Sequence, residues 1–167
     1  MSELPNQEFL FTLAEVAATF VGFSLIGGIL KTGEGPARFL LMRDVAQISL
    51  TAVAGSLLPY VLLQFGLEGE TLWRFSSVGV ALGWIIGGAF AYRRATITDA
   101  LWEWARALFV VGSLGNLGGV GLLLWTACFG GSISGPRYLL ALCILLTLAG
   151  LMFIWATLQK ASDPPVV

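Results

Sequence analysis

The chain has 167 residues, of which 57% are hydrophobic and only 11% are charged, with a formal net charge of −1. Soluble domains are roughly 45–50% apolar and about 25% charged, so a soluble fold is excluded, and the mean hydropathy of +0.86 predicts an integral membrane protein. The small net charge, with no basic patch, also excludes nucleic acid as a partner.

Apolar runs long enough to cross a hydrocarbon core of about 30 Å follow one another along the chain. The expected fold is a bundle of transmembrane helices, all-α, in a single transmembrane domain over residues 1–167. The five predicted spans lie near residues 9–30, 45–66, 73–92, 105–129 and 138–158.

The breaks between these runs carry helix-start residues. Pro36 and Pro136 each stand near a predicted first helical turn, where proline is well tolerated. A four-span alternative stays open, because the segment with Trp102 and Trp104 can also be read as a short interfacial helix.

Lys and Arg are distributed unevenly about five spans. Only Arg74 and Arg137 fall on one side, and the other seven fall on the opposite side. The positive-inside rule therefore predicts an amino terminus outside and a carboxyl terminus in the cytoplasm.

The first run contains a polar stripe, because Thr12, Glu15 and Thr19 recur at helical spacing. Glu15 lies six residues inside Phe9, about 9 Å below the membrane boundary, where an ionisable side chain is a functional candidate. One interpretation is a carboxylate ring that lines a cation path between several copies. The other is a protonated or paired Glu15 that only joins helices, with Arg74 as the candidate ion-pair partner.

The second run repeats this spacing near its predicted cytoplasmic end. Asp44, Gln47 and Thr51 share one helical face, and we expect them to be further candidates for an ion path.

Glycine is frequent, at 21 of 167 residues, and forms ridges that allow helices to approach closely. The predicted helix-packing residues are Gly79, Gly83 and Gly87 in the third run and Gly115 and Gly119 in the fourth. Spacing alone leaves open whether these ridges pack within one chain or between subunits.

Catalytic patterns are missing from the sequence. There is no His, no zinc motif, no phosphate loop and no dinucleotide fingerprint, so we expect neither an enzyme nor a bound metal or cofactor. Cys128 and Cys143 lack metal-ligand spacing and are interpreted as small apolar residues.

The stretch from Ala14 to Ser24, the Arg43-Asp44 pair and the stretch from Trp73 to Ser77 resemble small uncharacterised bacterial inner-membrane proteins. This resemblance implies a bacterial plasma-membrane location and no particular activity. The segment from Leu101 to Gly112 is similar to the small membrane subunit of tripartite transporters, which keeps an accessory role open.

The leading functional hypothesis is a small homo-oligomeric channel or pore that conducts cations, with Glu15 in the polar stripe of the first helix. The alternative is a non-conducting accessory or scaffold subunit, with other membrane subunits as partners beside the lipid bilayer.

Overall fold

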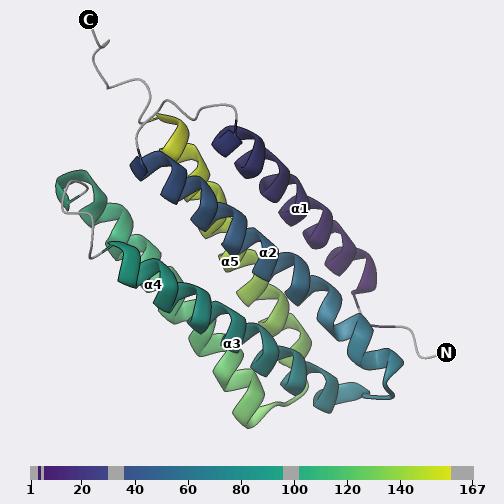
Figure 1. Cartoon of the computed structure of the whole chain (residues 1–167). Helices are drawn as coiled ribbons and strands as arrows, with labels where there is room; N and C mark the ends of the chain where they lie inside the picture. The colour runs from purple at the N-terminus through teal and green to yellow at the C-terminus, as the bar shows by residue number, and fades with distance from the viewer. Residues whose placement is uncertain (1–3, 5, 30–35, 96–101, 159–167) are drawn as a thin grey trace, which may run out of the picture.

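The computed structural model describes residues 4, 6–29, 36–95, 102–158 and contains five α-helices in these ranges (Figure 1). They are α1 (Gln7–Ile29), α2 (Pro36–Gln64), α3 (Gly69–Ala95), α4 (Trp102–Phe129) and α5 (Ser134–Leu158).

The predicted all-α fold with five membrane-spanning helices is confirmed. Each helix contains a stretch of 18 to 24 residues that is apolar and long enough to cross a bilayer. The helices are longer than the apolar runs, because backbone hydrogen bonding continues a helix into polar sequence. For example, α2 begins at Pro36, nine residues before the predicted span. Trp102 and Trp104 belong to α4, which continues without a break to Phe129.

The helices run up and down and pack around two central members. α5 contacts all four other helices, and α2 contacts α1, α3 and α5. In Figure 1, α1 lies at one edge of the bundle and α3 and α4 lie at the opposite edge, with α2 and α5 between them. We call the end where α1 begins the Gln7 side and the end where α5 finishes the Leu158 side.

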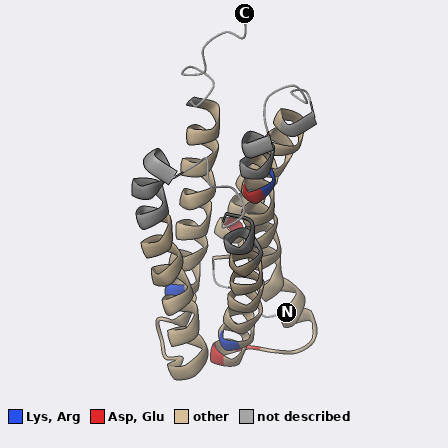
Figure 2. Ribbon diagram, turned by 60° about the vertical axis from the view of Figure 1, so that its left-hand side comes forward, with Lys and Arg blue, Asp and Glu red and all other residues tan. Residues whose placement is uncertain are grey.

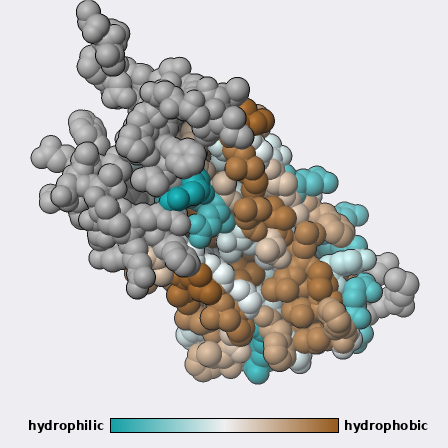
Figure 3. Space-filling model, viewed as in Figure 1, coloured by the Kyte–Doolittle hydropathy of each residue, from teal (hydrophilic) through white to brown (hydrophobic). Residues whose placement is uncertain are grey.

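The outer surface of the bundle is apolar along most of its length. Figure 2 shows long uncharged stretches in every helix, and Figure 3 shows brown apolar atoms over much of one face. Large apolar side chains that soluble proteins would bury are exposed on every helix, among them Phe23, Leu50, Leu82, Leu117 and Ile154. Lipid tails are the solvent for such a surface, so the chain is a multi-pass membrane protein.

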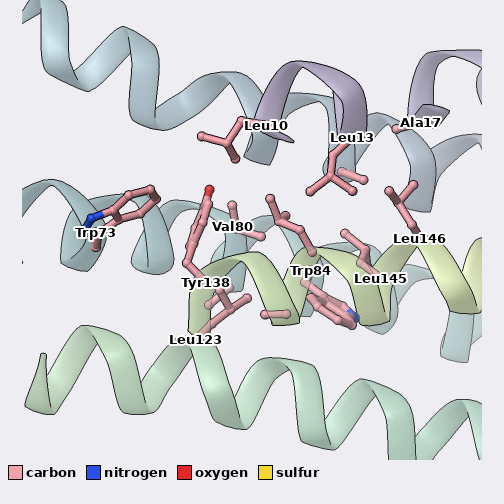
Figure 4. Packing of buried hydrophobic residues seen from close by; sticks show 14 of the residues in the cluster. Leu10, Leu13, Ala17, Trp73, Val80, Trp84, Leu123, Tyr138, Leu145 and Leu146 are labelled. Carbon is pink, nitrogen blue, oxygen red and sulfur yellow. The ribbon is translucent and has the colours of Figure 1, made fainter. Parts of the chain in front are cut away.

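The interior is filled by aromatic, leucine and alanine side chains from all five helices (Figure 4). Tyr138 and Leu123 are fully buried, and the Trp73 ring packs against the Tyr138 ring with centroids 5.5 Å apart. These side chains fill the space between the helices at the level of Trp73 and Tyr138.

A proline inside α2 leaves one backbone carbonyl of this core without its helical hydrogen bond. Pro59 has no backbone N–H, so the carbonyl of Gly55, four residues earlier, cannot receive its usual helical hydrogen bond. Tyr138 of α5 supplies the missing donor, since its hydroxyl lies 2.5 Å from the Gly55 oxygen. Gly55 permits the approach because it has no side chain: a Cβ there would lie 2.8 Å from Leu142 and 2.9 Å from Val80.

We expect Tyr138→Phe to lower the free energy of unfolding by about 1–3 kcal/mol, because it leaves the buried Gly55 carbonyl without a donor. The loss should shrink in a Pro59→Ala background, where residue 59 regains an N–H. Reversible unfolding in mixed micelles measures this double-mutant cycle. Tyr60→Phe is the matched control, because Tyr60 is exposed and only packs against Phe11. Strictly additive effects would disprove the link between Pro59 and Tyr138.

Candidate functional site: an outward polar stripe on the first helix

The two faces of α1 have different surroundings. Leu10, Leu13 and Ala17 are buried and point into the bundle (Figure 4). Ser24 continues this face and donates to the Phe20 carbonyl at 2.6 Å. The inner face of α1 is therefore fully used in packing within the chain.

The opposite face of α1 carries the polar residues. Glu8, Thr12, Glu15 and Thr19, which we call the α1 stripe, are all exposed on the single chain. The Thr12 hydroxyl donates to the Glu8 carbonyl and the Thr19 hydroxyl donates to the Glu15 carbonyl, each at 2.9 Å. Glu15 thus lies inside a candidate membrane span and points away from its own bundle.

Arg74 has a different partner from the Glu15 expected for it. Its Nη2 atom lies 2.6 Å from Oε1 of Glu70, one turn earlier on α3. This ion pair packs on Gly130 in the turn between α4 and α5, where φ is +58° and a side chain would collide with Glu70. The i, i+4 spacing explains the preference, because Glu70 and Arg74 stand one turn apart on the same helical face.

The second predicted stripe belongs to a contact within the chain. Thr51 and Gln47 of α2 lie against Gly83 and Gly87 of α3: a Cβ on Gly83 would be 3.6 Å from Thr51 Cγ2, and one on Gly87 would be 2.7 Å from Gln47 Nε2. Asp44, one turn from Gln47, is half-buried and has a bonding partner. In the described residues, the structure therefore separates this stripe from the α1 stripe.

The glycine ridges also lie between helices of the same chain. Gly79 faces Leu58 of α2, so all three predicted ridge glycines of α3 face α2. Gly115 faces Leu148 of α5, where a Cβ would lie 2.9 Å from the nearest leucine carbon, and Gly119 faces the Trp84 ring. Within a single copy, these glycines therefore pack helices of the same chain against one another.

A polar contact joins α3 to α4 beside Gly119. The indole Nε1 of Trp84 donates to Asn116 Oδ1, and Asn116 Nδ2 donates to the Gly112 carbonyl at 2.7 Å. Asn116 thus accepts one hydrogen bond from α3 and donates one within α4, and the first of these joins the two helices as amides commonly do in membrane bundles.

Two polar features were not identified from the sequence. The Tyr138 bond to Gly55 had a partial signal, because Pro59 marks the Gly55 carbonyl as free. The guanidinium of Arg43 has two buried nitrogens without a hydrogen-bond partner, and no pattern of residue spacing in the sequence predicts this.

Among the described residues, no three His, Cys, Asp or Glu side chains come together in a group that could hold a metal ion. Comparison of the chain with protein-family models, characterised proteins and solved structures gives no match. The chemistry of the residues themselves therefore carries the functional assignment.

Neighbouring glycines of α4 provide a test of the packing. Gly119→Ala should destabilise the protein by about 1–3 kcal/mol, because the new methyl group overlaps the Trp84 ring. Gly118→Ala should be neutral or slightly stabilising, since nothing lies within 4 Å and alanine favours helix. Unfolding midpoints of the two variants in the same detergent check this, and equal midpoints would contradict the α3–α4 contact.

Proposed function

We propose that the protein is the subunit of a homo-oligomeric membrane pore in which the α1 stripes of several copies line a cation path. The observation that carries this proposal is the position of Glu15. It is a carboxylate within a candidate membrane span, on the face of α1 that its own bundle leaves uncovered.

The depth of Glu15 makes a lipid-facing position costly. It lies eight residues after Gln7, which corresponds to about 12 Å along the helix axis. Charged side chains at the centre of a membrane helix cost about 2.5–3.5 kcal/mol on insertion scales, and they normally face other protein or water. Further copies of the same stripe around an aqueous axis would remove this cost for every subunit at once.

Buried side chains fill the interior of the bundle where the structure describes it. Tyr138, Leu123 and Ala17 have no exposed surface, and Trp84 fills the space between α3 and α4. A water-filled path therefore fits better between subunits than within one.

The α1 stripe favours cations over anions. The hydroxyl protons of Thr12 and Thr19 are already donated to carbonyls of α1, so these side chains offer oxygen lone pairs to the outside. Glu15 stands between them with a carboxylate. A ring of such residues presents acceptors and negative charge, which attract cations and repel anions.

The arrangement of copies can be tested by disulfide cross-linking at two adjacent alanines. Ala18 is exposed beside the stripe, whereas Ala17 is fully buried. In a background with Cys128 and Cys143 replaced by serine, Ala18→Cys should cross-link between copies in oxidised membranes and Ala17→Cys should not. If neither variant cross-links, α1 does not lie at an interface between subunits.

Conduction can be tested in planar bilayers. Glu15→Gln keeps the shape of the side chain and removes its charge, so cation conductance and cation-to-anion selectivity should fall by at least about threefold. Thermal stability should stay close to that of the parent, because Arg74 forms its ion pair with Glu70. Glu15→Asp is the matched control, because it keeps the negative charge on the stripe and should keep the cation selectivity.

The parent protein decides between pore and scaffold. Cross-linking of the Ala18→Cys variant, together with no cation current from the reconstituted parent, would disprove the pore and leave a non-conducting scaffold subunit.

A further inference from the structure

Arg43 lies at the second residue of the candidate span of α2, Met42–Gln64, near the Leu158 side. The residue is half-buried. Its Nε and Nη2 atoms are both shielded from solvent and have no hydrogen-bond partner in the described chain.

These two nitrogens lie on the same edge of the planar guanidinium. This is the edge with which arginine donates side by side to two oxygens of a phosphate or carboxylate. Arginine stays charged in proteins, so it cannot relieve burial by losing a proton. Buried donors in native proteins nearly always have a partner, and the open edge of Arg43 therefore calls for an oxyanion.

The other described arginine side chains share this feature only in part, since Arg74 Nε is also buried without a hydrogen-bond partner. Arg74 is paired with Glu70 through Nη2. Arg137 donates from Nη1 to the Gly130 carbonyl at 3.1 Å and lies over the Trp125 ring. Of these three, Arg43 alone leaves a whole binding edge open.

The row of residues on α2 locates this edge in the fold. Thr51 and Gln47 lie against glycines of α3, and Arg43 precedes Gln47 by one turn on the same face of α2. Arg43 therefore stands where the α2–α3 contact reaches the membrane boundary. The Leu158 side is also the side on which seven of the nine Lys and Arg residues are predicted to lie.

We propose that Arg43 binds a phosphate group at the end of the α2–α3 contact, with Nε and Nη2 donating to two phosphate oxygens. A phospholipid headgroup lies at this depth, and basic sites between membrane helices suit such groups. A free phosphate group has the same chemistry. The proposal is separate from the pore, because Arg43 lies on a different helix from Glu15.

The first experiment uses the full-length protein, stripped of lipid in a neutral detergent. Its unfolding temperature is compared with added dioleoylphosphatidylglycerol, with dioleoylglycerol, which has the same chains and no phosphate, and with sodium phosphate at constant ionic strength. The expected result is a higher unfolding temperature with the phosphate-bearing lipid than with dioleoylglycerol. A rise with the lipid alone assigns a headgroup, and a rise with sodium phosphate alone assigns a soluble phosphate. No rise with either overturns the proposal, and so does an equal rise with dioleoylglycerol.

The second experiment assigns the binding to the guanidinium edge. Arg43→Lys keeps the charge but loses the fork, so its affinity for whichever phosphate probe raised the unfolding temperature should fall by about tenfold. Native mass spectrometry measures the lipid and isothermal calorimetry measures sodium phosphate. Arg137→Lys is the matched control and should bind as the parent does, since that guanidinium already has its partners. Unchanged binding in Arg43→Lys overturns the proposal, and should that variant fail to fold, the phosphate-dependent stabilisation of the parent still decides it.

Discussion

The structure depends on one hydrogen bond, from the Tyr138 hydroxyl to the Gly55 carbonyl. In lipid no water is present to receive a spare backbone group, so the carbonyl that Pro59 releases must find a donor within the protein. Tyr138 meets this need from α5 and so fixes the depth of α5 against α2. Because α2 contacts α1 and α3, and α5 contacts all four other helices, this single register positions the whole bundle. Gly55 and the tilted Trp73 ring then shape the space that holds the phenol.

Small residues set the distances between helices and thereby decide which polar groups remain outside. Gly83 and Gly87 bring α2 and α3 together over Thr51 and Gln47, so that stripe is absorbed by the bundle. The α1 stripe has no such cover, because the inner face of α1 is occupied by Leu10, Leu13 and Ala17. The two stripes have nearly the same sequence spacing, yet one faces outward and the other lies against a neighbouring helix. In a membrane protein a polar face turned toward lipid is the more informative one, since it calls for water or protein from outside the chain.

The sequence predicted the number of helices and the composition of both stripes, because hydropathy and spacing are local properties. The preference of Arg74 for Glu70 was also within reach, since the two residues stand four apart on one helix. The direction in which each stripe faces was not, because it depends on how five helices rotate against one another. The bond between Tyr138 and Gly55 joins residues 83 apart, and the open edge of Arg43 is defined by what surrounds it. Such features appear only when the whole bundle is assembled.

Gly55 and Tyr138 lie far apart along the chain and are therefore synthesised at different times. At about 5–20 residues per second, the ribosome needs roughly 4–17 s to make the 83 residues that separate Gly55 from its donor. During that interval the first helices are already made and the Gly55 carbonyl is still unbonded. The hydrogen bond that joins α5 to α2 can therefore form only after Tyr138 has been made, so the register between these two helices is set later than the contacts among α1, α2 and α3.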